Sequence, residues 1–137
     1  MRRRSLGSVV ECYRGSSGVR VFRLDREAIL RQLRARALAL LEEDPSVLEV
    51  RLFGSLARNT ARPGSDADLL VVSSASEFPF LERSSHYARA FGAVGVGCDV
   101  FAYTLAELER MRKDGNGLIR SADAEGLLLA GRGTTTP

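Results

Sequence analysis

Residues 25–103 alternate between helix-like and strand-like patterns, and this alternation constrains the fold more than any other feature of the sequence. The first pattern repeats apolar residues every three or four positions, with Asp25 able to cap the first turn and Pro45 preventing continuation. These signals predict an amphipathic helix over 25–43.

Strand-like segments follow this helix. Residues 47–53 place apolar side chains at alternate positions and end at Gly54, and residues 66–72 form a second short apolar run. A helical pattern over 80–91 leads to a third strand over 96–103. The order helix, strand, strand, helix, strand predicts an α+β domain in which a small mixed sheet has helices packed on one side.

The C-terminal part of the chain predicts two further helices. Thr104 and Glu107 stand at the spacing of a capping box, in which each side chain binds a backbone amide at the start of a helix. Residues 115–117, Gly-Asn-Gly, break this helix, and a short helix is expected from Leu118. Residues 127–129 form a closing apolar segment.

The chain has 137 residues, which is enough for one domain with one core. We expect a basic N-terminal arm over 1–20 with a short strand near 19–22, a domain over 21–131 and a tail over 132–137. The net charge is 20 − 17 = +3, and its excess lies in residues 1–45, which carry ten basic and six acidic side chains. This local excess does not favour nucleic acid as the main partner, because a nucleic-acid groove usually needs a basic stripe on folded structure.

Cysteine usage and hydropathy indicate the compartment. Cys12 and Cys98 are too few and too far apart for a disulfide scaffold, which suits a reducing environment. No stretch approaches the uninterrupted apolar length that a membrane span needs. We therefore expect a cytoplasmic protein without a membrane partner.

Two aspartates open the second strand, although aspartate is depleted in strands. Asp66 and Asp68 are two residues apart, so on a strand they point to the same face and repel each other unless a cation lies between them. Asp99 lies in the third strand, which a crossover through the 80–91 helix can bring beside the second. Three carboxylates on one patch of sheet predict a site for one or two hard divalent ions such as Mg²⁺.

A candidate phosphate-binding turn precedes this strand. Gly54 lets the backbone approach a phosphate closely, Ser55 adds a hydroxyl donor, and the amides that start the following short helix face outward. Arg58 can add a charge-assisted contact one turn later. A phosphate-binding turn after one strand and a metal-binding acidic pair on the next are what NTP-dependent phosphoryl or nucleotidyl transfer requires.

Each of these signals has an ordinary alternative when it is taken singly. A Gly-Ser dipeptide is typical of a plain turn, and Asp66 of a loop cap. Asp99 can pair with an arginine such as Arg51, and Arg58 can be a solvated helix residue. The order in which the signals occur together favours the metal site.

The sequence resembles a known family at these positions. L-F-G-S-L-A-R at 52–58, followed by S-D-A-D-L-L-V-V at 65–72, resembles the signature of minimal nucleotidyltransferases in the DNA polymerase beta superfamily. C-D-V-F-A-Y-T at 98–104 resembles the strand that carries that family's third carboxylate. The remainder, to Gly131, is similar to the family's usual ending, with a final E-G-L-L-L.

The resemblance covers residues 25–131 and has two departures. Asn59 stands where the family usually has glycine, and residues 1–20 have no counterpart. The first departure concerns the phosphate-binding turn and not the acidic residues.

The resemblance implies roles for these residues. Gly54 and Ser55 would bind the phosphates of the NTP, Asp66 and Asp68 would hold both Mg²⁺ ions, and Asp99 would complete one metal site and help deprotonate the acceptor. The implied reaction transfers NMP, in the first instance AMP from ATP, to a hydroxyl group and releases pyrophosphate.

The resemblance also bears on the acceptor. Minimal members of the family are companions of small helical HEPN proteins in toxin–antitoxin pairs, which implies a protein acceptor and a hetero-complex. One alternative is a homodimer that acts on a small molecule, and another is a partner-binding module of the same fold without catalysis. The sequence leaves the acceptor, the NTP and the oligomeric state open.

Overall fold

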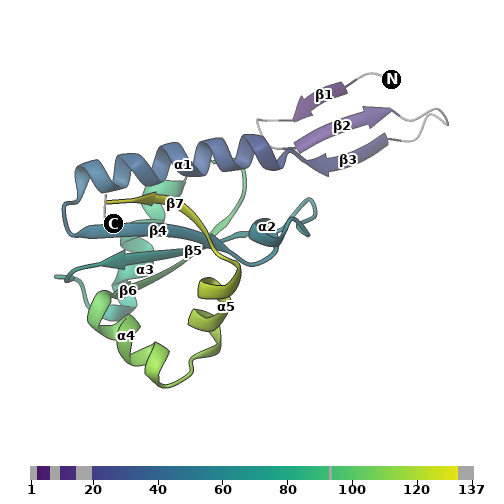
Figure 1. The fold of residues 1–137 in the computed structure, drawn as a ribbon. Helices are drawn as coiled ribbons and strands as arrows, with labels where there is room; N and C mark the ends of the chain where they lie inside the picture. The colour runs from purple at the N-terminus through teal and green to yellow at the C-terminus, as the bar shows by residue number, and fades with distance from the viewer. Residues whose placement is uncertain (1–2, 7–9, 15–19, 93, 133–137) are drawn as a thin grey trace.

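Three strands are followed by a mixture of helices and strands along the chain, as the computed structural model shows (Figure 1). The structure describes residues 3–6, 10–14, 20–92 and 94–132, and only the backbone of the first three strands. The elements in chain order are β1 (Arg3–Leu6), β2 (Val10–Arg14), β3 (Arg20–Leu24), α1 (Arg26–Glu43), β4 (Val47–Phe53), α2 (Ser55–Arg58), β5 (Ala67–Ser73), α3 (Phe80–Ala88), the 3₁₀ helix η1 (Arg89–Phe91), β6 (Cys98–Thr104), α4 (Leu105–Lys113), α5 (Gly117–Glu125) and β7 (Leu127–Gly131).

Four of the strands form the main sheet, in the order β6-β5-β4-β7. β4 runs antiparallel to both β5 and β7, whereas β5 and β6 run parallel. α3 lies in the connection between the parallel strands, because such a pair needs a crossover. The predicted mixed sheet and the predicted placement of the third strand beside the second are confirmed.

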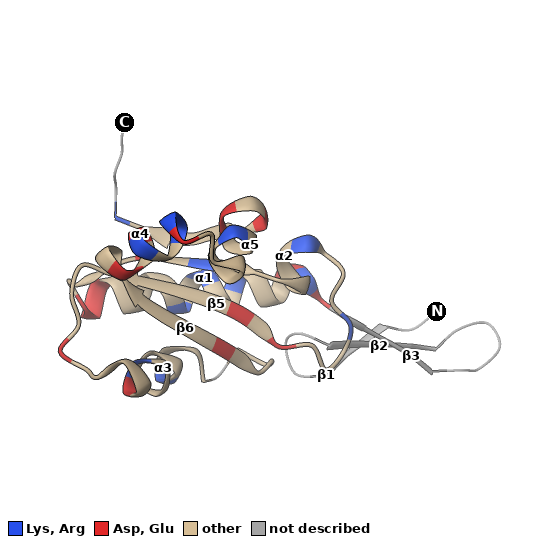
Figure 2. Ribbon diagram, turned by 90° about the horizontal axis from the view of Figure 1, so that it is seen from below, with Lys and Arg blue, Asp and Glu red and all other residues tan. Residues whose placement is uncertain are grey.

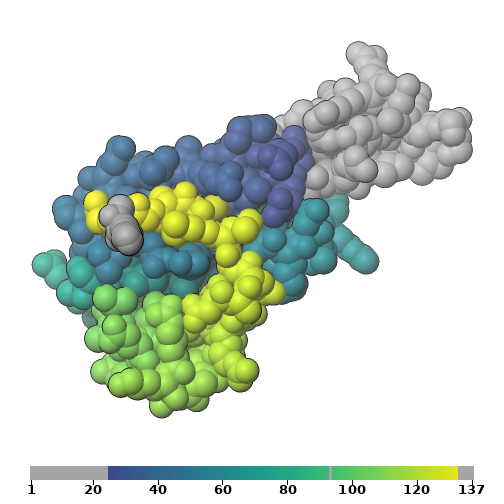
Figure 3. Space-filling model, viewed as in Figure 1, coloured from purple at the N-terminus to yellow at the C-terminus, as the bar shows by residue number. Residues whose placement is uncertain are grey.

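One face of this sheet carries the larger hydrophobic cluster. Leu69 and Val71 of β5 are fully buried there, together with Tyr87 of α3 and Phe91 of η1. α1 contributes seven buried residues to the same cluster, as its amphipathic pattern predicts. Figure 3 shows β7 lying along α1 at the surface of the molecule.

The opposite face of the sheet is covered by α4 and α5. Leu70 and Val72 alternate with the residues of the first cluster along β5, so they point the other way, and they pack with Leu108 of α4 and Ile119 of α5. The α+β class is confirmed, but the expectation that the helices pack on one side is wrong. β5 is apolar on both faces, and a strand of that kind needs a cover on each.

The ends of α4 and α5 follow their sequence signals. The Thr104 hydroxyl accepts a bond of 3.3 Å from the Glu107 N–H, and the Glu107 carboxylate accepts one of 2.8 Å from the Thr104 N–H, so the predicted capping box is present. The Asn116 side chain accepts from the first two amides of α5 after Gly117. No helix in the described ranges is long and apolar enough to cross a membrane.

β1, β2 and β3 form a separate three-stranded antiparallel sheet. β3 leads almost directly into α1, and Figure 1 shows this sheet at the N-terminal end of α1, away from the main sheet. The strand predicted near 19–22 corresponds to β3, which begins at Arg20. Parts of the predicted arm and tail lie outside the described residues, at 1–2, 7–9, 15–19 and 133–137.

Candidate active site

Two of the predicted carboxylates lie on neighbouring strands. Asp68 of β5 pairs in register with Asp99 of β6, near the start of both strands. Side chains two residues apart on a strand point to the same face, so Asp68 shares a face with Leu70, and Asp99 shares one with Phe101. This is the face that α4 and α5 cover further along the strands. Asp68 is half-buried and Asp99 is exposed. Figure 2 shows the acidic segments of the two strands near each other.

Asp66 precedes β5 and joins the same end of the sheet. The N–H of the next residue, Ala67, donates a bond of 2.8 Å to the Gly97 carbonyl at the start of β6. A Cβ atom at Gly97 would overlap a carboxylate oxygen of Asp66. The Asp66 side chain therefore lies against the backbone that leads to Asp99, and the three predicted carboxylates lie at the same end of the sheet.

The three carboxylates have no hydrogen-bonding or ion-pairing partner within the described part of the chain. Burial raises the pKa of Asp68, and the negative charges of Asp99 and Asp66 raise it further, while the charge of Arg58 opposes them. Like charges are thus held together without compensation from a paired cation. Arg51, the alternative partner for Asp99, pairs instead with Glu49.

The structure shows no ready-made metal centre. Among the described residues, no three His, Cys, Asp or Glu side chains are arranged to hold an ion. The chemistry of the donors nevertheless fits a hard divalent cation, because all three groups are carboxylates and a cation would relieve the repulsion that raises the pKa of Asp68.

The turn after β4 touches the acidic strand. Gly54 has φ +77°, which disfavours other residues, and a Cβ atom there would overlap a carboxylate oxygen of Asp68. Glycine is therefore favoured at this position for two reasons, which are the positive φ and the close approach of the backbone to Asp68. Ser55, half-buried, begins α2, and its carbonyl accepts a bond of 2.9 Å from the Thr60 N–H.

Asn59, where the family pattern usually has glycine, ends α2 in the left-handed region, with φ +62° and ψ +37°. It is the one non-glycine residue with positive φ in the described ranges. Asparagine tolerates this conformation better than most residues. Asparagine is therefore compatible with the conformation at this position.

Arg58 has a partner that the sequence analysis did not anticipate. Its guanidinium donates a bond of 2.8 Å to the carboxylate of Glu125, at the end of α5, and the Ser121 hydroxyl donates one of 3.0 Å to the same oxygen. The Ser121 bond, the charge of Arg58 and the Gly54 backbone N–H together lower the pKa of Glu125. The only sequence signal for this residue is its place in the E-G-L-L-L ending.

Cys98, between Gly97 and Asp99, is a free thiol. Burial raises its pKa to about 11, and the charges of Asp66 and Asp99 act in the same direction. The thiol is protonated at neutral pH and is not an activated nucleophile.

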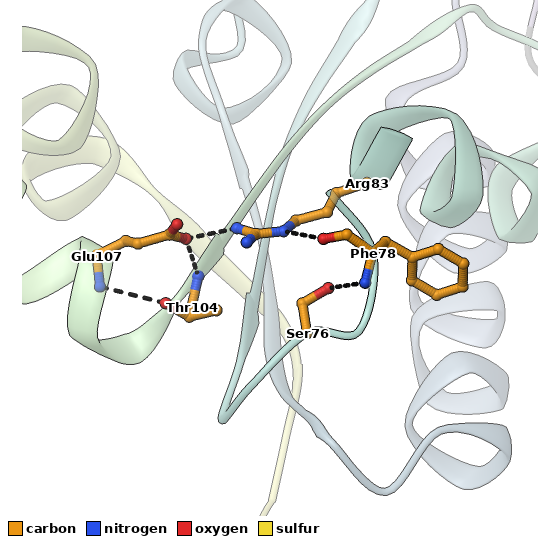
Figure 4. A network of polar contacts seen from close by, with 5 residues as sticks. All are labelled: Ser76, Phe78, Arg83, Thr104 and Glu107. Atoms are coloured by element: carbon orange, nitrogen blue, oxygen red, sulfur yellow. Dashed lines mark hydrogen bonds and ion pairs between the residues drawn. The ribbon is translucent and has the colours of Figure 1, made fainter. Parts of the chain in front are cut away.

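Paired charges occupy the other end of β5 and β6 (Figure 4). Arg83 of α3 donates a bond of 2.5 Å to the Glu107 carboxylate and one of 3.2 Å to the Phe78 carbonyl. The Phe78 N–H in turn donates to the Ser76 hydroxyl at 3.2 Å. These bonds join α3, α4 and the loop after β5. The Arg83 side chain at their centre is only 11% exposed.

A family model described as the nucleotidyltransferase domain matches residues 33–116, which is more than half of the chain. The match spans α1 to α4 and includes all six predicted site residues. No curated protein matches the chain.

Solved structures resemble the fold. A protein from Sulfolobus solfataricus described as a candidate nucleotidyltransferase has a TM-score of 0.54 and 21% identity, over 78% of this chain and 84% of that one. A toxin–antitoxin structure with AMP-PNP has a TM-score of 0.48 and 21% identity, over 72% and 73%. A tri-AMPylated Shewanella oneidensis HEPN toxin in complex with MNT antitoxin gives 0.45 and 20%, over 74% and 72%. At these identities the first similarity shows a shared fold.

Proposed function

This chain belongs to the family of nucleotidyltransferase domains, and we propose that it transfers AMP from ATP to a hydroxyl group and releases pyrophosphate. The observation that carries this proposal is the pairing of Asp68 with Asp99 directly beside the Gly54 turn. It places unpaired carboxylates next to a backbone that can closely approach a phosphate. We assign the reaction to the domain over 21–131.

The residues take the following roles in this proposal. Asp66 and Asp68 hold Mg²⁺, and Asp99 completes one metal site. The bound metal supplies charge stabilisation at the phosphates and lowers the barrier to loss of pyrophosphate. Ser55 and Arg58 contact the phosphates, and Gly54 allows their close approach.

The transfer itself is a single displacement at the α-phosphorus. The acceptor oxygen forms a bond to this phosphorus, the bond from it to the bridging oxygen of the β-phosphate breaks, and pyrophosphate leaves. Asp99, exposed at the edge of the site, takes the proton of the acceptor hydroxyl.

We propose a small helical protein of the HEPN class as the acceptor and partner, and this part rests on the sequence resemblance alone. Mass spectrometry of such a protein, encoded beside this chain, after incubation with ATP and Mg²⁺ tests it. Addition of AMP supports the protein acceptor. An unmodified partner that still forms a complex would favour the non-catalytic module.

Calorimetric titration of ATP into the protein with Mg²⁺ tests the nucleotide site. We expect metal-dependent binding that is lost in the double variant Asp66→Asn, Asp68→Asn, because the substitutions remove the charge that holds the metal. Asp123→Asn is the control, since it neutralises an acid of α5 that pairs with Arg112 away from the turn. Absence of binding of any NTP to folded wild-type protein would contradict the proposal.

A further inference from the structure

The register between β4 and β7 fixes the position of Glu125. Leu52 pairs with Leu127 in the antiparallel ladder. Gly54 follows Leu52 by two residues and Glu125 precedes Leu127 by two, so both lie just beyond the same end of this ladder. The last residue of α5 therefore faces the turn after β4, although 71 positions separate the two in the sequence.

Gly126 allows the end of α5 to lie close to β4. A Cβ atom there would overlap the Ala122 carbonyl and would lie 3.5 Å from the Leu52 carbonyl oxygen. The Gly126 N–H also donates to the Ala122 carbonyl at 2.9 Å, which ends α5 directly against β4. Glu125 is thus presented to the turn by backbone that has little freedom to move.

The carboxylate of Glu125 binds the end of α2. It accepts a bond of 2.8 Å from the guanidinium of Arg58, and the Gly54 backbone lies close enough to help lower the pKa of Glu125, after the larger effects of Ser121 and Arg58. The Ser121 hydroxyl, one turn earlier in α5, fixes the same oxygen from its own helix. Arg26 of α1 supports the turn from the other side, through a bond of 2.9 Å to the Leu56 carbonyl.

We propose that Glu125 is a positioning residue for nucleotide binding, because it holds residues 54–59 in the conformation that places Ser55 and Arg58 beside Asp68. This inference rests on the proposed function for its link to nucleotide. Gly54 contributes its positive φ and its close approach to Asp68, and Ser55 supplies donors for the phosphates. Glu125 acts through the turn and touches no reacting atom.

Hydrogen exchange of the backbone amides tests the positioning without nucleotide. In Glu125→Ala we expect the exchange rate of residues 54–59 to rise about tenfold, while α1 and β4 stay protected. Glu125→Gln keeps an acceptor oxygen and the shape of the side chain, so most of the protection returns. Unchanged exchange at 54–59 in Glu125→Ala would overturn the inference.

Nucleotide affinity gives the second readout. With ATP and Mg²⁺ as the probe, Glu125→Ala should raise the dissociation constant about fivefold to tenfold, and Glu125→Gln should recover most of this loss. A purely structural role predicts exchange changes without this loss and rescue. Wild-type affinity in Glu125→Ala would therefore overturn the inference.

Asp123→Ala is the matched control. Asp123 lies two residues earlier on α5 and accepts two bonds of 2.9 Å from Arg112, so its removal also breaks an ion pair of this helix. An equal rise in exchange at 54–59 in Asp123→Ala would overturn a specific role for Glu125. If no NTP binds the wild-type protein while exchange still rises in Glu125→Ala, the turn-holding role stands and the proposed function fails.

Discussion

The two ends of the parallel pair β5 and β6 differ in whether their charged side chains are paired. At the start of the strands, Asp68 and Asp99 lie side by side without a partner in the described part of the chain. At the other end, Arg83 and Glu107 pair at 2.5 Å and Thr104 completes the network. Paired charges hold elements together, whereas unpaired like charges on neighbouring strands destabilise the fold unless a ligand binds them. The contrast separates the proposed metal-binding carboxylates from a structural ion pair.

The pKa directions express the same contrast. The pKa of Asp68 is raised, by burial and by the two neighbouring carboxylates. Burial also acts to raise the pKa of Glu107, but hydrogen bonds from Thr104 and Arg83 outweigh it and lower that pKa. Charge at Asp68 opposes folding, and charge at Glu107 favours it.

The largest expected effect is on turnover. Asp68→Asn should lower the rate of pyrophosphate release from ATP, with Mg²⁺ and the acceptor present, about a thousandfold, which corresponds to about 4 kcal/mol. Glu107→Gln, a carboxylate lost at the other end of the strands, should leave the rate unchanged. Equal rates for Asp68→Asn and the wild-type protein would contradict the proposed role of the unpaired carboxylates in catalysis.

The next effect is on stability at the paired end. Arg83→Met should lower the free energy of unfolding by about 1–3 kcal/mol, because it removes a largely buried partner from Glu107 and from the Phe78 carbonyl. Denaturant unfolding measures the change. The activity per folded molecule should stay the same.

An exposed ion pair provides the control for this loss. Arg112 pairs with Asp123, and their side chains are 42% and 41% exposed. Arg112→Met should cost less than about 1 kcal/mol. A larger loss there than in Arg83→Met would show that burial does not distinguish the two pairs.

At the unpaired end, removal of charge should stabilise the metal-free protein. A raised folded-state pKa means that stability falls as the pH rises above the ordinary value of Asp68, about 4. Asp68→Asn should therefore raise the free energy of unfolding at pH 7, by at most about 1 kcal/mol because solvent screens the partly exposed carboxyl. The gain should vanish in unfolding curves recorded below pH 4. Destabilisation at pH 7 would contradict the repulsion.

The smallest effect is the acid response of the paired end, which has the opposite sign. A lowered pKa means that the contribution of Glu107 is complete above its ordinary value and is lost as the pH falls through the folded-state value. Glu107→Gln should flatten this part of the stability curve by under about 1 kcal/mol. Thermal unfolding between pH 5 and pH 2 checks it, and an unchanged acid slope would contradict the assignment.

Local patterns predicted most of the fold. The strand over 47–53 and the capping box at Thr104 depend on neighbouring residues, and the structure has both. Asp68 and Asp99 could be expected on neighbouring strands because strands that are consecutive in the chain are usually adjacent in a sheet. The neighbouring position of the two strands is confirmed, and the metal-binding role of the three aspartates stays a prediction.

Contacts between residues that are far apart in the sequence could not be predicted from local patterns. Arg58 meets Glu125 across 67 positions, and no local signal reports that pair. Helical spacing places Leu81 on one face with Ala88 and Phe91, yet Leu81 is 88% exposed, and Tyr87 is the buried residue of α3. The expectation of helices on one side only was wrong for a similar reason. A short apolar run in the sequence does not indicate whether one or both faces of the strand are covered.

β5 is hydrogen-bonded on both sides, to β4 and to β6, and it carries Asp68 at its half-buried start. A carboxylate on a central strand cannot move away from its neighbours without disturbing the core. The electrostatic work of assembling the like charges is therefore done once, when the chain folds. It does not recur as reorganisation energy in each catalytic cycle, which is the condition under which fixed charges accelerate a reaction most.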